Sequence, residues 1–210
     1  MTTTNESNPL TESGQTVLPT EFGTFLVSAF GFEPNKNHLI LVYGKINQGD
    51  SPLVRIHSEC ITSEVFGSLK CDCKSQLLES IDLIKSAGSG IIIYLRQEGR
   101  GIGLFNKIEA YRLQELGHNT ISANLELELP VDTRDYELAY RILRSRGINS
   151  IRLITNNDDK VDQMKRYGLG IKEIIHTNKH YNTVNNEYID TKITHMGHKY
   201  LNHDKTSIPY

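Results

Sequence analysis

Short apolar runs alternate with amphipathic segments along most of the chain. Runs rich in Ile, Leu and Val, with the length and composition of strands, occupy residues 38–46, 53–59, 90–97, 150–156 and 171–177. Apolar residues at helical spacing predict helices over residues 75–86, 104–116 and 186–200, one that starts at Asp132, and a short one that ends at Gly168. The earlier strands could pair antiparallel, whereas the later ones need helical crossovers. We therefore predict an α/β fold, a single domain with a mixed β-sheet flanked by helices.

The two ends of the chain lack this alternation. The first residues are rich in Thr, Asn, Ser and Glu, and we predict a disordered N-terminal arm over residues 1–17. The predicted folded domain covers residues 18–201, and residues 202–210 form a polar tail. The N-terminus lacks the basic start and apolar centre of a secretory signal, and no apolar run approaches the ~18 residues of a membrane helix. We expect a cytoplasmic protein without a membrane partner.

Composition and charge narrow the class of ligand. Hydrophobic residues make up 38% and charged residues 23%, as in an ordinary globular protein, and 210 residues suffice for one domain with a substantial core. The formal net charge of −2 gives no global attraction to nucleic acid or to acidic membranes. If the ligand is a polyanion, positive charge must be gathered locally around its site.

The three cysteines, Cys60, Cys71 and Cys73, are clustered. In a reducing compartment, this clustering and their odd number favour a metal site or catalysis over disulfides. Thiolates are soft ligands that favour zinc or iron–sulfur sites. Three protein ligands leave the fourth position of a tetrahedral zinc open, as in catalytic sites, where a bound water becomes a nucleophile. Two alternatives stay open: buried free cysteines, and a structural zinc closed by His57 as the fourth ligand.

A glycine-rich turn, RQEGRGIGL at residues 96–104, lies between a predicted strand and a predicted helix. Backbone N–H groups at a helix N-terminus favour phosphate oxygens, and Arg96 and Arg100 could bind phosphate or a base edge with two hydrogen bonds each. Glu98 could accept hydrogen bonds from an N–H pair such as guanine presents. The glycine spacing matches neither a Rossmann fingerprint nor a P-loop. Glycines required only for packing are an equally open explanation.

Two polar segments are further candidates. In DTRD, Asp132 could simply cap the predicted helix, but Arg134 in its first turn would meet the positive end of the helix dipole, which favours an anionic partner. TNNDDK, residues 155–160, follows a predicted strand, where α/β proteins place ligands, although a polar turn is the simpler interpretation. The histidines of the C-terminal third, His198 among them, show no metal-ligand spacing and are expected to be surface or core residues.

Together these motifs resemble the GTP cyclohydrolase II family in their order and spacing. They are VRIHSEC, SLKCDC, YLRQEGRGIGLFNKIEAYRLQELG, ANLELELPVDTRDY, LITNN and MGHKYL. The resemblance implies a zinc-dependent hydrolase of riboflavin biosynthesis that opens the guanine ring of GTP at C8. Formate and pyrophosphate are released, and the product is a diaminopyrimidinone ribosyl phosphate. The resemblance also implies one Zn²⁺ per chain, Mg²⁺ with the triphosphate, and a homodimer.

The resemblance assigns roles to individual residues. Asp132 matches a proton acceptor, Arg134 a nucleophile and Tyr111 a residue near the guanine ring. The matched nucleotide-binding residues are Arg55, Ile56, His57, Ser58, Glu59, Gln76, Glu98, Gly99, Arg100, Thr120, Thr155 and Lys160. Because a guanidinium keeps its proton, it is a poor nucleophile. Our hypothesis is that Arg134 mainly stabilises charge at the α-phosphorus.

The same resemblance bears on the metal. Cys60, Cys71 and Cys73 match three zinc ligands, and the segment leading into Cys60 matches nucleotide contacts. An open zinc site is therefore favoured over one that His57 closes.

At two positions the sequence departs from the family pattern. Glu128 stands where the family usually has a glycine, and Asp158 where LITNN is usually followed by proline. Both add negative charge near a polyanion, which bears on rate and substrate range. Two other functions stay open. One is a paralogous enzyme that opens the ring in another pathway or stops at the formylated intermediate. The other is a zinc-stabilised nucleotide-binding regulator without turnover.

Overall fold

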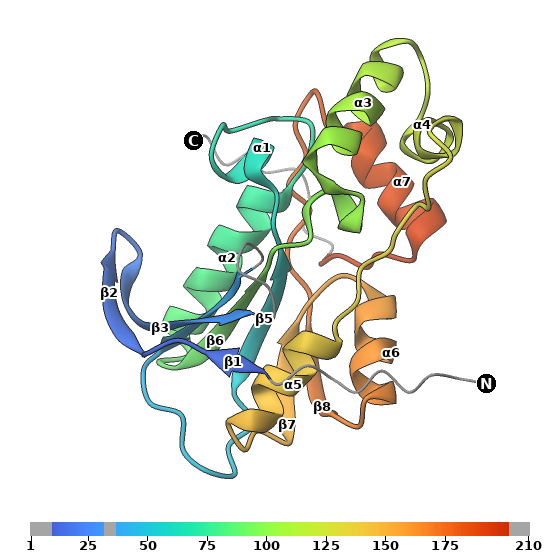
Figure 1. The fold of residues 1–210 in the computed structure, drawn as a ribbon. Helices are drawn as coiled ribbons and strands as arrows, with labels where there is room; N and C mark the ends of the chain where they lie inside the picture. Colours follow the sequence, from blue (N-terminus) through green and yellow to red (C-terminus); the bar gives the residue numbers. More distant parts are fainter. Residues whose placement is uncertain (1–9, 32–36, 202–210) are drawn as a thin grey trace, which may run out of the picture.

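The computed structural model describes residues 10–31 and 37–201, and the remaining residues lie outside the description. Its strands are β1 (Thr11–Glu12), β2 (Thr16–Thr20), β3 (Gly23–Gly31), β4 (Asn37–Tyr43), β5 (Leu53–Ser58), β6 (Gly90–Leu95), β7 (Ser150–Ile154) and β8 (Gly170–Ile175). Its helices are α1 (Ile61–Glu64), α2 (Cys73–Ser86), the 3₁₀ turn η1 (Glu98–Gly101), α3 (Gly103–Glu115), α4 (Thr120–Glu126), α5 (Glu137–Ser145), α6 (Asp158–Arg166) and α7 (Asn186–Met196). Figure 1 shows one sheet with helices on both faces.

The strands form an eight-stranded mixed sheet in the order β1-β3-β4-β6-β5-β7-β8, and β2 also pairs with β3. The pairs from β1 to β6 along this order are antiparallel, and the pairs β6–β5, β5–β7 and β7–β8 are parallel. Helices α2 and α6 make the crossovers between parallel neighbours, as such connections require. The predicted mixed α/β fold is confirmed.

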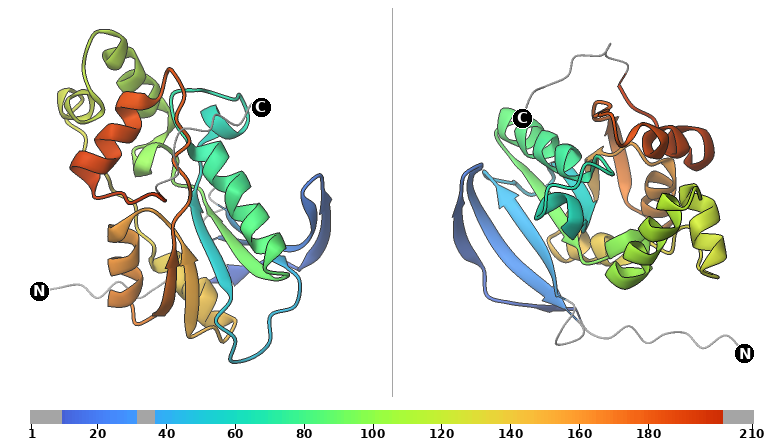
Figure 2. Two further views of the ribbon diagram at one scale, coloured as in Figure 1. Left: turned by 180° about the vertical axis from the view of Figure 1, so that it is seen from behind. Right: turned by 90° about the horizontal axis from the view of Figure 1, so that it is seen from above.

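The central strands are buried on both faces, which explains their unbroken apolar runs. Along β6, Ile91 and Ile93 pack with helices α5 and α6 in one core cluster, whereas Ile92 packs with α2 in the other. The parallel strands all end at one edge of the sheet, and α1, η1 and α3 follow directly from β5 and β6 there. Figure 2 shows α3, α4 and α7 gathered at this edge, away from the antiparallel strands. This edge is where an α/β sheet offers a ligand crevice.

The N-terminal arm is shorter than predicted. Residues 11–12 lie in β1 and residues 16–17 lie in β2, and both strands pair antiparallel with β3. We did not predict β3, one edge of which supplies the backbone hydrogen bonds of β1 and β2. Glu12 also accepts a hydrogen bond from Ser28 Oγ at 2.6 Å. Residues 1–9 of the predicted arm, and the tail 202–210, lie outside the described residues.

The helix predicted from Asp132 begins five residues later, at Glu137. Its N-cap is Tyr136, and Asp135 Oδ1 accepts the backbone N–H of Glu137 at 2.6 Å. The segment before the helix is held in a loop because Thr133 N–H donates to the Arg100 carbonyl at 3.0 Å. The prediction that Arg134 occupies the first turn of a helix is wrong. The last helix is also shorter than predicted and ends at Met196, where Gly197 turns left-handed with φ 63°.

Glu128 occupies a conformation that glycine favours. Its φ is +54°, in the left-handed region. It follows α4 in a Schellman arrangement, in which Glu128 N–H donates to the Leu125 carbonyl at 3.0 Å and Leu129 N–H to the Asn124 carbonyl at 2.9 Å. A Cβ in this conformation costs about 1–2 kcal/mol. The departure from the family pattern at this position therefore has a local cost in stability.

We expect Glu128→Gly to stabilise the protein by about 1 kcal/mol, because glycine relieves the left-handed strain. Urea denaturation would measure the change. The matched control is Glu126→Gly, which removes a side chain from the last residue of α4. Since glycine is unfavourable in a helix by about 1 kcal/mol, the control is expected to shift the free energy of unfolding in the opposite direction. Destabilisation by Glu128→Gly would contradict the assignment.

Asp158, the second departure, is the first residue of α6. Proline suits this position because its N–H is not needed there, and an acidic residue suits it because the helix dipole is positive at this end. Asp158 Oδ2 also lies 2.7 Å from Lys199 Nζ. Its added negative charge is therefore balanced within the chain.

Within the described part, none of the helices is both long and apolar enough to cross a membrane.

Candidate active site

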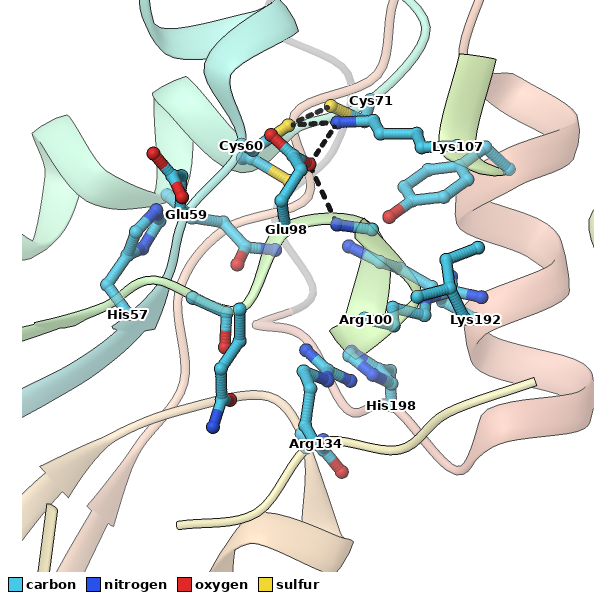
Figure 3. Close-up of a pocket in the computed structure, with 18 of the residues that line it drawn as sticks. His57, Glu59, Cys60, Cys71, Glu98, Arg100, Lys107, Arg134, Lys192 and His198 are labelled. Carbon is cyan, nitrogen blue, oxygen red and sulfur yellow. Dashed lines mark hydrogen bonds and ion pairs between the residues drawn. The ribbon is translucent and has the colours of Figure 1, made fainter. Parts of the chain in front are cut away.

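A pocket opens at the carboxyl ends of β5, β6 and β7 (Figure 3). It is lined by residues from β5, the starts of α1 and α2, the glycine-rich turn, α3, α4, the loop before α5, the start of α6 with the turn before it, and α7 with the turn after it. Most of the predicted site residues line it: Arg55, His57, Ser58, Glu59, Cys60, Cys71, Cys73, Gln76, Glu98, Gly99, Arg100, Tyr111, Arg134, Thr155 and Lys160. Residues that are distant in the sequence are thus brought to one site.

The remaining predicted residues lie elsewhere. Ile56 is fully buried in the core, since it alternates with Arg55 along β5, and its carbonyl accepts from Lys160 Nζ at 2.5 Å. Asp132 is not among the lining residues but contacts Arg134, which is. Thr120 is the first residue of α4, and its side chain lies outside the description. Ile56 therefore positions Lys160 through its backbone.

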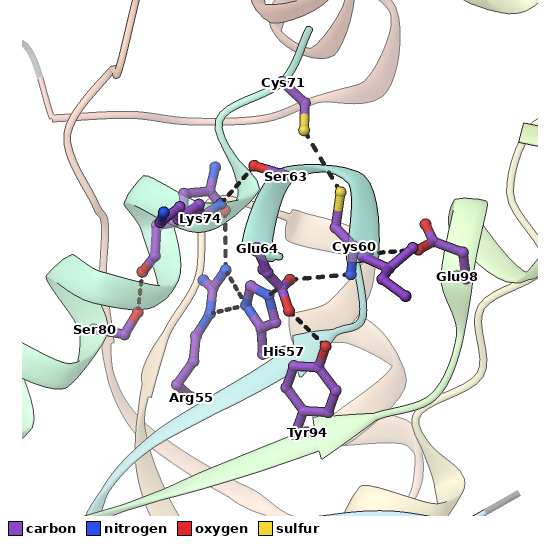
Figure 4. A network of polar contacts seen from close by, with 12 residues as sticks. Arg55, His57, Cys60, Ser63, Glu64, Cys71, Lys74, Ser80, Tyr94 and Glu98 are labelled. Atoms are coloured by element: carbon purple, nitrogen blue, oxygen red, sulfur yellow. Dashed lines mark hydrogen bonds and ion pairs between the residues drawn. The ribbon is translucent and has the colours of Figure 1, made fainter. Parts of the chain in front are cut away.

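The three cysteines form a compact cluster. Cys60 precedes α1, and Cys71 and Cys73 flank Asp72 at the start of α2. Their Sγ atoms all lie within 4.8 Å of one another, and Cys60 Sγ is 3.6 Å from Cys71 Sγ (Figure 4). Among the described residues, no His, Asp or Glu joins this group as a fourth potential ligand. The cluster is therefore compatible with a metal ion that has three protein ligands.

His57 is engaged elsewhere, which disfavours the closed structural zinc site. Its Nε2 lies 2.8 Å from Glu64 Oε1, and its Nδ1 lies 3.3 Å from Arg55 Nη2. Glu64 also accepts from the Cys60 N–H at 3.0 Å and from Tyr94 Oη at 2.5 Å (Figure 4). Burial lowers the pKa of His57, although the Glu64 carboxylate opposes the shift. The His57 ring thus links β5, the strand that leads into Cys60, to Glu64 of α1.

Lys107, which we did not predict, lies beside the cysteines. Its Nζ is 3.1 Å from Cys60 Sγ and 2.7 Å from Glu98 Oε1, and both side chains of the ion pair are buried (Figure 3). Hydrogen bonds from Cys71 and Cys73, together with the charge of Lys107, hold the pKa of the Cys60 thiol well below its usual range. The sequence carried a signal for this residue, since Lys107 shares the buried face of α3 with Ala110 and Leu113.

Both carboxylate oxygens of Glu98 are occupied by the chain itself. Oε2 accepts the Ile61 N–H at 2.7 Å, and Oε1 accepts the Gly99 N–H at 2.8 Å as well as Lys107. Glu98 therefore ties the glycine-rich turn to α1 and the cysteine cluster. This geometry favours a positioning role over the hydrogen bonds to a base edge that we had expected from it.

Lys107→Met is expected to destabilise the protein by about 3 kcal/mol, because the Glu98 carboxylate is then left buried without its cation. Chemical denaturation would measure this loss. Lys70→Met is the matched control, since Lys70 forms a more exposed ion pair with Glu115 at 3.1 Å. The control should change stability by no more than about 1 kcal/mol. Equal effects of the two substitutions would contradict the assigned importance of the Lys107–Glu98 pair.

Three consecutive residues of the glycine-rich turn have left-handed backbone conformations. Gly99, Arg100 and Gly101 have φ values of 63°, 61° and 94°, and a left-handed non-glycine residue such as Arg100 is a recognised mark of functional sites. A Cβ on Gly101 would lie 2.2 Å from Thr133 Oγ1, so only glycine lets the loop before α5 approach this closely. The turn therefore serves to bring Arg100 and Arg134 to one pocket.

Positive charge is concentrated in the pocket, as a polyanionic ligand would require. Arg100, Arg134, Lys160 and Lys192 all line it, although the whole chain has a formal net charge of −2. Burial lowers the pKa of Lys160 well below its usual range, and the charges of Arg55 and Arg134 add to the shift. A bound anion would offset this repulsion.

Asp132 and Arg134 form a tight ion pair. Arg134 Nε donates to Asp132 Oδ1 at 2.9 Å, and Nη2 donates to Oδ2 at 2.5 Å. Burial disfavours the charged form of each group, but the interactions of the pair outweigh this effect. The hydrogen bonds and charge of Arg134 lower the pKa of Asp132. Tyr136 and Asp132 raise the pKa of Arg134. The pair thus keeps Arg134 protonated.

Several buried polar atoms of the pocket have no hydrogen-bond partner. Within the described part of the chain, they are Ser58 Oγ, Gln97 Oε1, Arg100 Nη2 and His198 Nδ1. Buried polar atoms in native proteins are nearly always paired. Four such atoms around one pocket indicate a polar ligand. Of these residues, Gln97 and His198 were not among our predicted site residues.

The chain is similar to known proteins of one family. A family model described as GTP cyclohydrolase II matches residues 11–176. The GTP cyclohydrolase-2 of Pasteurella multocida is 47% identical over 194 residues, which cover 91% of this chain and 88% of that protein. The GTP cyclohydrolase-2 of Neisseria gonorrhoeae is 46% identical over 181 residues, covering 86% of this chain and 92% of that protein.

Two further similarities are of other kinds. The riboflavin biosynthesis protein RibBA of Bacillus cereus is 43% identical over 192 residues, which are 90% of this chain but 48% of that protein. A solved two-domain 3,4-dihydroxy-2-butanone 4-phosphate synthase, RibBX of A. baumannii, aligns with 71% of this chain and 35% of that chain at a TM-score of 0.37 and 16% identity, a similarity too low to bear on the fold. The family match and the identity of the relatives establish that the chain belongs to the GTP cyclohydrolase II family of enzymes.

Proposed function

We propose that the chain hydrolyses the imidazole ring of GTP at C8 in a zinc-dependent reaction. Formate and pyrophosphate are released, and a diaminopyrimidinone ribosyl phosphate enters riboflavin biosynthesis. One observation carries the proposal: the three-thiol cluster and the cations Arg100, Arg134 and Lys160 line the same pocket. Such a pocket can hold a hydrolytic metal beside a nucleotide triphosphate.

The thiol cluster fits zinc. Zn–S distances of about 2.3 Å place tetrahedral sulfur ligands roughly 3.8 Å apart, and Cys60 Sγ and Cys71 Sγ are 3.6 Å apart. With Cys73 as the third ligand and no fourth side-chain ligand among the described residues, one position stays available for solvent. A zinc ion held there would supply a hydrolytic water at neutral pH. Mg²⁺ would accompany the triphosphate.

The chain's own residues bind and orient the nucleotide. Lys160 and Arg100 supply charge for phosphate oxygens. Arg55 is held by Gln76 Oε1 at 2.9 Å, so it presents its guanidinium in one place. Tyr111 lines the pocket beside the cysteines and offers a ring against which a base can pack. The backbone of Gly99 and the side chains of Ser58, Glu59 and Thr155 complete the proposed nucleotide contacts.

Arg134 stabilises charge at the α-phosphorus as pyrophosphate leaves. Its ion pair with Asp132 supports this role, since a nucleophilic guanidine would first have to transfer a proton to Asp132, whose lowered pKa makes it a weak base. Asp132 therefore anchors Arg134 and accepts a proton only if substrate weakens their contact. Trapping a phosphoramidate at Arg134 by mass spectrometry would refute the electrostatic role.

The decisive experiment is incubation of the purified protein with GTP and Mg²⁺. We expect a new pyrimidine absorbance, with formate and pyrophosphate in equal amounts. Measuring the two products separately distinguishes the paralogous reaction that stops at the formylated intermediate, because that reaction yields pyrophosphate without formate. A protein that is metal-free yet fully active would overturn the proposal.

We also propose a homodimer in the cytoplasm, as the family resemblance implies. Large apolar side chains are exposed on the segment after α1 and on α3, notably Phe66 at 77% and Phe105 at 80%. Lys70 joins these two segments, since its Nζ lies 4.9 Å from the centre of the Tyr111 ring. Exposed apolar surface of this kind marks interaction sites. Sedimentation equilibrium would test the dimer.

A further inference from the structure

The C-terminal segment, defined here as residues 185–200, forms one wall of the pocket. The family model ends at residue 176, and this segment lies beyond it. Three of its residues, Tyr188, Lys192 and His198, line the pocket. Figure 3 shows Lys192 and His198 on the side of the pocket that faces Arg100 and Arg134. None of the three was among the site residues that the family resemblance implies.

This segment is firmly attached to the domain. Lys192 Nζ lies 2.6 Å from Asp72 Oδ1, in an ion pair whose side chains are 7% and 0% exposed. Asp72 stands between Cys71 and Cys73, and its other oxygen accepts from Tyr200 Oη at 3.2 Å. Two contacts therefore fix the segment to the cysteine loop itself. Lys199 N–H also donates to the Asn156 carbonyl at 2.8 Å, which ties the segment to the β7–α6 turn.

The attachment directs His198 into the cation cluster. Gly197 turns the chain in a left-handed conformation, and His198 forms an antiparallel bridge with Asn157. Burial lowers the pKa of His198 to about 2, and the charges of Lys192, Arg134, Arg100 and Lys160 contribute to the shift. The imidazole is therefore neutral among four cations.

His198 has an unsatisfied hydrogen-bonding atom in this place. Its Nδ1 and the Nη2 of Arg100 are both buried, and both lack a partner in the described part of the chain. Arg100 is further oriented by Tyr188, whose ring centre lies 5.5 Å from Arg100 Cζ. An anionic oxygen that accepts a hydrogen bond from each of these atoms would satisfy both and offset the repulsion among the cations.

We propose that His198 is a substrate-binding residue that contacts a phosphate oxygen of the nucleotide through Nδ1, and that the Lys192–Asp72 ion pair is the positioning contact that holds it there. The proposal rests on the proposed function, since it takes the polyanion to be the triphosphate of GTP. It extends the active site into the C-terminal segment. The segment is then part of the catalytic domain that we predicted to span residues 18–201.

The test compares phosphate binding in the zinc-loaded wild type and in His198→Ala. A hydrogen bond to a charged group is worth about tenfold to a hundredfold in affinity. We expect the dissociation constant of tripolyphosphate with Mg²⁺ to rise by this factor in calorimetry. The inhibition constant of guanosine against GTP turnover should stay unchanged. His195→Ala is the matched control, because His195 is exposed on the same helix, and it should behave as the wild type.

Two further variants distinguish the loss of the His198 contact from a loosening of the C-terminal segment. In His198→Asn the side-chain amide can take the place of Nδ1, and we expect most of the lost tripolyphosphate affinity to return. Lys192→Met should reproduce the loss of affinity and also increase hydrogen exchange in α7, as a positioning contact requires. The proposal would be overturned if tripolyphosphate binding were unchanged in His198→Ala. It would also be overturned if the inhibition constant of guanosine rose by the same factor as the dissociation constant of tripolyphosphate.

The two proposals fail in different ways. If the wild type converts GTP but His198→Ala binds tripolyphosphate equally well, only the role of His198 is wrong. If the wild type makes no pyrimidine from GTP, the proposed reaction is wrong, and the tripolyphosphate titration still decides whether His198 contacts phosphate.

Discussion

Cys73→Ser is expected to remain folded, to lose zinc and to lower the rate of ring opening by about a thousandfold or more. A hydroxyl is a far poorer zinc ligand than a thiolate, and a hydrolytic metal contributes several kcal/mol to the transition state. The fold should persist because Cys73 belongs to neither hydrophobic core cluster. Metal analysis, circular dichroism and the formate assay would measure the three properties.

This variant also separates an enzyme from a zinc-stabilised regulator. A regulator that needs zinc for its structure predicts that Cys73→Ser unfolds. The matched control is Lys74→Ser, which changes the exposed neighbour in the same helix turn and should keep both zinc and activity. A folded, zinc-free Cys73→Ser protein with a normal rate would exclude the cysteine cluster from catalysis.

Arg134→Ala and Asp132→Asn are each expected to lower kcat by about a thousandfold while GTP still binds measurably. Removing a preorganised charge from the transition state of phosphoryl transfer costs about 3–4 kcal/mol. Asp132→Asn acts indirectly, since the carboxylate that accepts from both Nε and Nη2 of Arg134 is lost. Single-turnover kinetics and equilibrium binding of GTP would separate the loss in rate from the loss in affinity.

Two further variants make this result specific. Arg134→Lys keeps a positive charge but loses the planar pair of donors, and we expect an intermediate rate. Arg144→Ala removes an exposed arginine from the last turn of α5 and should leave kcat unchanged. Near-normal turnover in Arg134→Ala or Asp132→Asn would remove that residue from its assigned role.

Sequence patterns predicted the central sheet because its strands are buried on both faces. The run over residues 90–97 contains three consecutive isoleucines, and the structure has β6 there as Gly90–Leu95. We did not predict β3, although its Phe25, Val27 and Phe30 are buried. We also did not predict β1 and β2, which are almost entirely exposed and whose order comes from hydrogen bonds with β3. Backbone pairing leaves little trace in side-chain chemistry.

The start of α5 shows the limit of local signals. The sequence predicts a cap at Asp132. In the structure α5 begins after Tyr136, because Thr133 is held by the Arg100 carbonyl from a turn far away in the chain. A long-range contact thus decided where the helix begins, and with it the place of Arg134.

By itself, the sequence determined the mixed α/β fold, the adjacency of Cys71 and Cys73, the glycine-rich turn and the family. These follow from residue types at fixed spacing along the chain. Only the tertiary structure decided that Ile56 faces the core, that the oxygens of Glu98 are already occupied, and that Lys107 and His198 face the pocket. The physical reason is that the direction and partners of a side chain depend on sheet order and on packing between distant segments, which spacing along one chain does not encode.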